Sequence, residues 1–501
     1  MKSIMVVGTT SHAGKSMLVT ALCRILSRRG WRVAPFKGQN MALNSYVSTT
    51  GAEIGYAQAV QAWAAGVSPQ AEMNPILLKP QGDQTSQVIL KGRPIGRTTA
   101  QKYYEEFFSA GWQAIQESLA RLSQEFDLLI CEGAGSPAEI NLKHRDLANM
   151  RVASYLEAPT ILVADIDRGG VFAHIVGTLE LLEPEERALI KGIVINKFRG
   201  QRSILQPGID WLEERTGIPV IGVIPWIDAA FPAEDSLSLL ERPAVKSQAE
   251  ITVAVIRLPR ISNFTDFDAL EAEPSVNVKY LSPKDDLGYP DAVILPGTKT
   301  TISDLLALQQ TGMAEAIVNY AAAGGTVMGI CGGFQIMGQM LADPEGLEGQ
   351  EGRFNGLGLL PLRTVITQQK VARQRTVSSK FPQEGLPIVG YEIHQGRTQL
   401  VVSTGNDEEN SFLPIFDDRS LGIVDAAQSV WGTYLHGIFD NGPWRRAWLN
   451  RLRQQRGLRS MPTGIANYRE QRDSMLNTLA TTIEEYIDLD PILASSQSNQ
   501  Q

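Results

Sequence analysis

The sequence predicts an α/β protein with two domains, each built on a largely parallel sheet. Three observations predict this fold class. Short apolar, β-branched runs alternate with segments of helical periodicity, a polar segment interrupts the alternation once, and several runs end in glycine-rich turns. Apolar strands separated by helices are buried on both faces, so they indicate parallel sheets covered by helices. The length of 501 residues suits two or three domains.

The first alternating region predicts a domain over residues 1–240. Its first strand is followed by a helix expected over residues 15–29, where leucine and isoleucine share one face. Six strands are expected, at residues 3–8, 31–36, 126–133, 159–167, 191–198 and 218–226.

A second alternating region predicts another domain over residues 251–490. The polar, proline-containing segment 241–250 is expected to be a linker. The segment 491–501, rich in serine and glutamine, is expected to be disordered. Strands in the second domain are expected at residues 251–259, 276–281, 291–297 and 325–333.

Composition limits the function classes. The formal net charge of -8 argues against nucleic-acid binding through bulk charge, so any basic groups that bind an anionic small molecule must be local. Cys23, Cys131 and Cys331 have no paired spacing, which favours reduced thiols over disulfides or a zinc site. No segment resembles a signal peptide or a membrane span, and a cytoplasmic location is expected. The oligomeric state is left open.

The stretch GTTSHAGKS (8–16) predicts a phosphate-binding loop between a strand and a helix. Its first two glycines are separated by five residues, one more than in the standard P-loop. Glycines allow backbone N–H groups to turn inward, and a helix N-terminus favours anions. Thr10, Gly14 and Lys15 are expected to contact phosphate, and Ser16 is expected to bind Mg²⁺.

Polar side chains follow other strands of the first domain, where ligands of open α/β sheets gather. Glu132 is the expected metal partner of the loop, with Asp165 and Asp167 as less favoured candidates. Lys37 is expected to steady a γ-phosphate or an acyl phosphate, and Asn196 is expected to bond a purine edge. Ordinary capping acids and polar loops are the alternative interpretation of these positions.

The segment GICGG in the second domain predicts a reactive cysteine. Cys331 occupies the central position of a G-x-nucleophile-x-G turn, where a helix N-terminus favours the thiolate. A buried structural cysteine is the alternative. The thiol needs a base, for which His436 is the first candidate and His394 the second. Backbone N–H groups of Gly297, Thr298 and Gly332 are expected to form an oxyanion hole.

An ATP site and a Cys–His acyl-transfer site in one chain suggest glutamine-dependent amidation. The cysteine would release ammonia from an amide, and ATP would activate a carboxylate as an acyl phosphate. Phe334 and Gln335, beside the cysteine turn, are expected to belong to the glutamine site.

Over nearly its whole length the chain resembles the cobyric acid synthase family of cobalamin-pathway amidotransferases. The motifs that carry the resemblance are GTTSHAGKS, PFKGQNMALNS, CEGAGSPAEINL, ADIDRGGVFA, VINKFRG, NFTDFDAL, LPGTKTT, GICGGFQIMG, GYEIHQGRT and GTYLHGIF. The first domain is similar to dethiobiotin synthetase, which has the same loop spacing, and the second to class I glutamine amidotransferases.

The resemblance implies a reaction and its cofactors. Adenosylcobyrinic acid a,c-diamide would be amidated at its b, d, e and g carboxylates with ATP, Mg²⁺ and glutamine. By position, Lys15 and Ser16 would handle phosphate and Mg²⁺, Glu132 would bind the metal, Cys331 would be the nucleophile and His436 its base. An enclosed ammonia path between the domains is also expected.

Two features of the predicted sites need explanation. Related glutaminases have Glu two residues after the histidine, whereas this chain has Ile438. The resembled family lacks that acid, so the resemblance implies a Cys–His dyad, with Glu392 as a speculative substitute that would orient His436. A substrate with several carboxylates also needs basic contacts. The basic candidates at the strand ends of the first domain are Arg145, Arg168, Lys197 and Arg199, and the uncharged Asn40 is a further candidate for substrate binding.

Two other functions stay open. The same chemistry on another substrate, as in cobyrinic acid a,c-diamide synthase, is the nearer alternative, although ADIDRGGVFA and PFKGQNMALNS favour the first assignment. A non-catalytic P-loop ATPase scaffold is the other, and the intact GICGG and GTYLHG segments argue against it.

Overall fold

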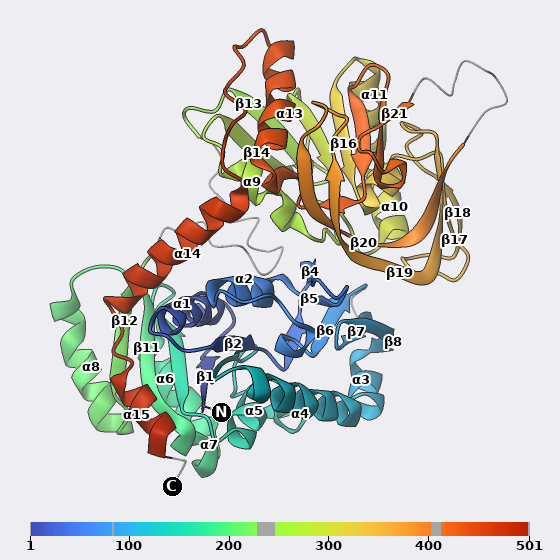
Figure 1. Cartoon of the computed structure of the whole chain (residues 1–501). Helices are drawn as coiled ribbons and strands as arrows, with labels where there is room; N and C mark the ends of the chain where they lie inside the picture. The colour runs from blue at the N-terminus through green and yellow to red at the C-terminus, as the bar shows by residue number, and fades with distance from the viewer. Residues whose placement is uncertain (1, 83–84, 228–245, 402–411, 499–501) are drawn as a thin grey trace.

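The computed structural model describes residues 2–82, 85–227, 246–401 and 412–498, which form two lobes in contact with each other (Figure 1). The first lobe contains the described residues from 2 to 227, and the second contains the described residues from 246 to 467. The C-terminal helices cross from the second lobe back to the first. Of the predicted linker, 241–250, the first half (241–245) lies outside the described residues.

The first lobe is built on a six-stranded parallel sheet with the order β12-β11-β10-β1-β9-β2. Alternate residues of its central strand face opposite apolar layers, Ile4 and Val6 on one side and Met5 and Val7 on the other. The predicted parallel sheet is therefore confirmed. Its strands are β1 (Lys2–Gly8), β2 (Val33–Phe36), β9 (Leu128–Glu132), β10 (Thr160–Asp165), β11 (Ile190–Phe198) and β12 (Val220–Pro225).

Helices cover both faces of this sheet, as buried apolar strands require. The layer containing Ile4 packs against α1, and the opposite layer packs against α4, α6 and α8. The helices of the lobe are α1 (Lys15–Arg28), α2 (Tyr56–Ala64), α3 (Ala100–Glu106), α4 (Phe108–Glu125), α5 (Met150–Tyr155), α6 (Val171–Leu181), α7 (Pro184–Leu189) and α8 (Arg202–Thr216), with 3₁₀ turns η1 (Ala71–Met73) and η2 (Ile140–Arg145).

Two small sheets of the first lobe face the second lobe. Sequence patterns did not predict them, because their strands are short and lack long apolar runs. The Val47 carbonyl accepts a hydrogen bond from Gln374, and Arg97 donates to the Gly346 carbonyl at 2.9 Å. The strands are β3 (Gln39–Met41), β6 (Ile76–Pro80), β7 (Thr85–Leu90) and β8 (Arg93–Thr99), and the pair β4 (Ser45–Val47) and β5 (Glu53–Gly55).

The second lobe contains a seven-stranded mixed sheet with the order β14-β13-β15-β16-β23-β22-β21. Strands β14 to β23 in this order pair in parallel, and the last two are antiparallel. The strands are β13 (Ile251–Ile256), β14 (Val276–Leu281), β15 (Ala292–Leu295), β16 (Thr326–Ile330), β21 (Phe412–Pro414), β22 (Gly422–Asp425) and β23 (Val430–Thr433).

A five-stranded sheet, dominated by a long β19–β20 hairpin, extends the second lobe along the contact with the first (Figure 1). Its strands are β17 (Met340–Asp343), β18 (Gly352–Asn355), β19 (Leu362–Ser378), β20 (Pro387–Leu400) and β24 (Leu435–His436). The helices of the lobe are α9 (Asp268–Glu271), α10 (Thr301–Thr311), α11 (Met313–Ala322), α12 (Gly332–Ile336) and α13 (Gly442–Gln455), with 3₁₀ turns η4 (Phe264–Phe267), η5 (Arg419–Leu421) and η6 (Ile438–Asp440).

The C-terminal helices correct two expectations. Helix α14 (Tyr468–Glu484), in the segment assigned to the second domain, packs its apolar side against α1 of the first lobe. Helix α15 (Asp490–Ser498) continues through most of the segment expected to be disordered, and its Ile492 is fully buried. Packing against a distant surface orders this segment, which local composition does not reveal. Within the described residues, no helix is long and apolar enough to cross a membrane.

Candidate active site

The loop of residues 8–16 joins β1 to α1 and is supported by a neighbouring strand. Gly14 has a φ of 100°, and a Cβ atom there would lie 2.0 Å from Nδ2 of Asn196. Both facts require glycine at this position. Asn196, on β11, donates from Nδ2 to the Ala13 carbonyl at 2.9 Å. Asn196 therefore supports the loop, and its predicted contact with a purine stays a prediction.

Lys15 begins α1 and directs its ammonium group into this loop. Its Nζ atom donates to the carbonyl oxygens of Thr10 at 3.0 Å and Gly135 at 2.9 Å. The side chain is largely buried, with only 7% of the residue exposed. The cation expected to bind phosphate thus lies at the centre of the loop expected to bind it.

Glu132, at the end of β9, joins the loop to two further elements. Its Oε1 atom accepts hydrogen bonds from Ser16 Oγ at 2.9 Å and from Lys37 Nζ at 2.8 Å, and its Oε2 accepts from Gln61 of α2. A serine hydroxyl beside one carboxylate fits Mg²⁺, which takes its remaining ligands from nucleotide phosphates and water. Among the described residues, no group of three or more His, Cys, Asp or Glu side chains is arranged to hold a metal.

The predicted substrate cations do not form one cluster. Lys197 pairs with Asp165 at 2.8 Å, and Arg199 pairs with Asp167 at 3.0 Å. The structure thus brings together residues that the sequence assigned to separate roles. Asn40 is buried and donates to Gln58 at 2.9 Å.

The remaining two candidates lie after other strands. Arg145 ends η2, beyond β9, and donates to the ring of His144 at 3.0 Å. Arg168 follows β10 and is exposed. Both arginines therefore lie beyond the carboxyl ends of sheet strands, as predicted, but on different segments.

Cys331 lies in a sharp turn between β16 and α12. Its φ of 52° and ψ of -109° are rarely adopted by residues with a side chain, and strain of this kind gathers at functional sites. A Cβ atom at Gly333 would lie 2.0 Å from the Leu295 carbonyl oxygen, so the turn packs directly on β15. The thiol, with 9% of the residue exposed, lies 3.2 Å from the Ile393 carbonyl oxygen. The turn has the geometry of a nucleophile elbow.

The residues expected around the cysteine separate into two groups. Thr298, Gly332 and Gln335 line a cavity together with Cys331, and Gln335 donates to the Gln395 carbonyl at 2.9 Å. A Cβ atom on Gly332 would lie 3.1 Å from the Thr298 backbone nitrogen, so the backbones of these two residues lie close together.

Gly297 and Phe334 flank this cavity without lining it. A Cβ atom at Gly297 would lie 3.3 Å from the ring of His436. Phe334 is buried against Tyr434, with ring centroids 5.1 Å apart, and its part in the glutamine site is better described as packing.

His436, on β24, shares the cavity with Cys331 and is oriented by Asp266. Its Nδ1 atom lies 2.7 Å from Asp266 Oδ2, while the backbone N–H of Gly437 donates to Asp266 Oδ1 at 2.8 Å. The ring also stacks on Tyr391 at a centroid distance of 5.2 Å. The arrangement resembles a nucleophile–histidine–carboxylate triad, in which the acid fixes the tautomer and orientation of the ring.

Electrostatics favour the protonated form of His436. Burial by itself lowers the pKa of His436, but the Asp266 carboxylate and the Cys331 side chain outweigh it and raise the pKa to about 10. An imidazolium beside a thiol stabilises the thiolate, which is the nucleophilic form of cysteine.

Glu392 does not substitute for the missing glutamate. Its carboxylate pairs with His394 at 3.0 Å and with Arg373 at 2.7 Å, so the expectation that it orients His436 is wrong. Sequence reasoning missed Asp266 because it lies 170 positions before His436, where no spacing rule connects them. The available signal was its place in NFTDFDAL, a motif with no assigned role.

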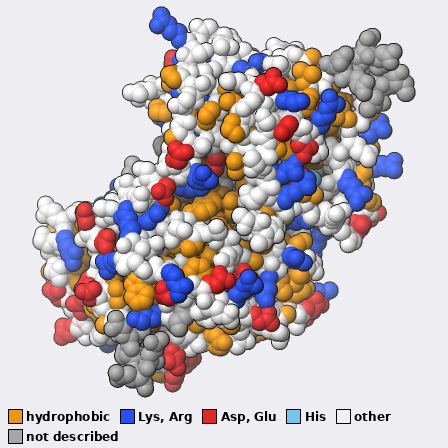
Figure 2. Space-filling view, in the orientation of Figure 1, with side chains coloured by type: hydrophobic (Ala, Val, Ile, Leu, Met, Phe, Trp, Pro, Cys, Tyr) orange, Lys and Arg blue, Asp and Glu red, His pale blue; other side chains and the backbone are white. Residues whose placement is uncertain are grey.

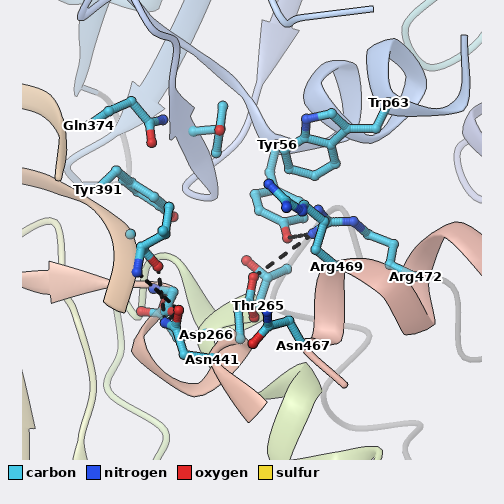
Figure 3. A pocket seen from close by; sticks show the side chains of 15 residues that line it. Tyr56, Trp63, Thr265, Asp266, Gln374, Tyr391, Asn441, Asn467, Arg469 and Arg472 are labelled. Carbon is cyan, nitrogen blue, oxygen red and sulfur yellow. Dashed lines mark hydrogen bonds and ion pairs between the residues drawn. The ribbon is translucent and has the colours of Figure 1, made fainter. Parts of the chain in front are cut away.

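A second cavity, of about 180 Å³, lies between the lobes beside Asp266. Figure 3 shows Asp266 and Tyr391 on one side and Tyr56, Trp63 and Arg472 on the other. The molecule is hollowed between its lobes, where hydrophobic and basic side chains gather (Figure 2). The surroundings of the Asp266–His436 pair are therefore built by both lobes.

Two protein-family models match the chain. The model described as the CobQ/CobB/MinD/ParA nucleotide binding domain matches residues 4–239. The model described as the CobB/CobQ-like glutamine amidotransferase domain matches residues 252–444.

Curated relatives match over almost the entire chain. The cobyric acid synthase of Nostoc sp. (strain PCC 7120 / SAG 25.82 / UTEX 2576) is 73% identical, and the match covers 98% of this chain and 99% of the relative. This chain belongs to the cobyric acid synthase family. The family members of Nostoc punctiforme and Synechococcus elongatus are 72% and 65% identical, each over 99% of this chain and 100% of the relative.

Membership in the cobyric acid synthase family settles the class of reaction. The chain is an ATP-dependent, glutamine-hydrolysing amidotransferase of cobalamin biosynthesis, with the nucleotide-binding domain first and the amidotransferase domain second. The roles of individual residues belong to the proposal that follows.

Proposed function

We propose that this chain converts adenosylcobyrinic acid a,c-diamide to adenosylcobyric acid by amidating its b, d, e and g carboxylates. The observation that carries the proposal is the cavity in which Cys331 and the Asp266-bound His436 meet, in the same chain as the P-loop. One site would release ammonia and the other would activate a carboxylate to receive it.

In the first step, Cys331 Sγ attacks the side-chain amide carbon of glutamine. The backbone N–H groups of Gly332 and Thr298 would stabilise the oxyanion. The C–N bond breaks as protonated His436 gives its proton to the departing nitrogen, which leaves as ammonia. Water then attacks the thioester and gives a proton to His436, and glutamate leaves with the thiolate restored.

In the second step, a substrate carboxylate oxygen attacks the γ-phosphorus of ATP, giving an acyl phosphate and ADP. Ammonia then attacks the acyl carbon, phosphate leaves, and the nitrogen gives up a proton to form the amide. Lys15 and Lys37, whose ammonium groups lie at the loop and beside Glu132, would hold the transferring phosphoryl group. Mg²⁺ would neutralise phosphate charge when held by Ser16 and Glu132.

The corrinoid substrate would bind beyond the strand ends of the first lobe. Lys197 and Arg199 are partly neutralised by Asp165 and Asp167, so their attraction for carboxylates is weaker than their charges alone suggest. Reversing their charge is expected to raise the KM for the corrinoid. A cytoplasmic location stays a prediction.

Mass spectrometry of the corrinoid after incubation with the protein, Mg-ATP and glutamine tests this function. Four successive replacements of OH by NH₂ are expected. Absence of any replacement with either glutamine or ammonium would reject the proposed substrate.

Cys331→Ser separates the two half-reactions. This variant is expected to lose amidation with glutamine and to retain it with ammonium chloride, because only ammonia release uses the thiol. Retention of glutamine-dependent amidation would reject Cys331 as the nucleophile.

A further inference from the structure

Buried charged side chains that the mechanism above does not use surround Cys331. Three lysines and one glutamate line the same cavity: Lys79, Lys299, Lys370 and Glu348. We propose that this cluster, which we call the charge cluster, binds the α-carboxylate and α-ammonium groups of glutamine, and that Lys79 makes glutamine binding depend on contact between the lobes. The inference rests on the proposed function, since it places glutamine at Cys331.

Lys299 supplies an unsatisfied positive charge. It follows Thr298 in the turn after β15, and only 7% of the residue is exposed. Its ammonium group has no hydrogen-bond or ion-pair partner among the described residues. Burial, together with the positive charge of Lys370, lowers the pKa of Lys299 to about 7. A buried cation facing a cavity is stabilised when an anion enters, and the α-carboxylate of glutamine is such an anion.

Glu348 supplies the opposite charge in the same cavity. Its carboxylate accepts a hydrogen bond from Thr301 Oγ1, and its backbone N–H donates to Asp343 Oδ2 at 2.6 Å. Burial raises the pKa of Glu348. A ligand ammonium group would restore its negative charge. The cavity therefore offers both signs of charge, as an amino-acid ligand requires.

Lys79 brings the first lobe into this cavity. It lies on β6, and its Nζ atom donates to Glu53 Oε1 at 2.7 Å and to Ser45 Oγ at 2.9 Å. Lys370, on β19 of the second lobe, pairs with the other oxygen of the same Glu53 carboxylate. One buried anion thus holds two cations from different lobes. The excess positive charge beside the cavity favours a carboxylate.

This arrangement couples glutamine hydrolysis to the assembled two-lobe molecule. If the lobes separate, Lys79 leaves the cavity together with its partner Glu53, and the α-carboxylate loses part of its binding site. Binding of the α-carboxylate and α-ammonium groups would also position the side-chain amide of glutamine at Cys331. Ammonia is then released only when the acceptor site is adjacent.

Steady-state kinetics of Lys79→Met in the full chain tests the inference. We expect the KM for glutamine to rise at least about tenfold, because one charged hydrogen bond is lost. The KM for ammonium chloride is expected to change less than about twofold, because ammonia bypasses the cavity. With 4-aminobutanamide, which lacks the carboxylate, the variant and the parent protein should hydrolyse the amide with similar KM.

Gln374→Met is the matched control. It also removes one side-chain hydrogen bond between the lobes, to the Val47 carbonyl, but Gln374 does not line the Cys331 cavity. Its KM for glutamine should stay close to that of the parent protein. An equal rise in both variants would overturn the inference, because lobe contact alone would explain it.

Other outcomes are equally informative. An unchanged glutamine KM in Lys79→Met would overturn the inference. Loss of Cys331 alkylation by iodoacetamide in the same variant would also overturn it, because this reagent carries no charge and its reaction does not depend on a bound carboxylate. Loss of corrinoid amidation with both nitrogen sources in the parent protein would instead count against the proposed function. Lys299→Met gives a second test within one lobe, with the same expected rise in glutamine KM.

Discussion

Asp266 and His436 lie 170 positions apart, yet their side chains are 2.7 Å from each other and both are buried. The carboxylate does two things for the histidine: it fixes which ring nitrogen faces the cavity, and it stabilises the imidazolium. The same carboxylate accepts the backbone N–H of Gly437. A single residue thus replaces the glutamate whose usual position Ile438 occupies.

Replacing this acid by its amide tests the role. Asp266→Asn is expected to lower kcat for glutamine hydrolysis by about 100-fold or more, because the wrong tautomer is favoured. Ammonium-dependent amidation should be retained. Glu392→Gln is the control, since Glu392 contacts His394 and Arg373 instead. Comparable glutaminase losses in both variants would contradict the assignment.

The pH dependence follows from the same pair. Asp266, with a further contribution from Cys331, raises the pKa of His436 to about 10 against the opposing effect of burial. The contribution of the protonated His436 to the stability of the folded protein is fully present below the unfolded pKa of about 6.5. It is lost as pH rises through the pKa of His436 in the folded protein. Glutaminase activity should therefore decline on the alkaline side near pH 10, measured as kcat/KM. In Asp266→Asn the alkaline decline of kcat/KM should move to lower pH. A decline at the same pH as in the parent protein would show that another group titrates.

At the scale of elements, α14 connects the lobes through its two ends. Tyr468 packs in the core of the second lobe, whereas Leu476, Leu479 and Ile483 pack against α1 in the first. Arg472, between these ends, lies 3.7 Å from the centroid of the Trp63 ring of α2. The helix therefore holds the two lobes against each other and forms part of the cavity between them.

Truncation on the apolar side of α14 should destabilise the first lobe. Ile483→Ala is expected to lower the free energy of unfolding by about 2–5 kcal/mol, because the residue is fully buried. Thermal unfolding measures this change. Glu485→Ala, at the exposed residue that follows the end of α14, should stay within about 0.5 kcal/mol. Equal stability of the two variants would mean that α14 does not pack as described.

For the whole molecule, Glu53 is the buried anion that the two lobes share. Burial opposes its ionisation, but Lys370 and Lys79 outweigh burial and hold the pKa of Glu53 well below its ordinary value. This stabilisation is present above the unfolded pKa of about 4.3 and is lost as pH falls through the folded value. The contact between the lobes should thus weaken in acid.

Neutralising Glu53 leaves two buried cations without their anion. Glu53→Gln is expected to lower the free energy of unfolding by roughly 3–5 kcal/mol, measured by chemical denaturation. Adding Lys79→Met to this variant should recover part of the loss, because one unpaired charge is removed. Additive losses in the double variant would contradict a direct interaction.

The sequence by itself determined the fold class, because apolar runs and glycine-rich turns are local patterns that parallel sheets require. It also located the loop around Lys15 and the turn at Cys331, whose spacing is set within a few residues. Only the tertiary structure paired Asp266 with His436, brought Lys79 to the cysteine cavity and returned α14 to α1. These contacts join positions far apart in the chain, and they arise from the packing of whole lobes, which no local pattern encodes.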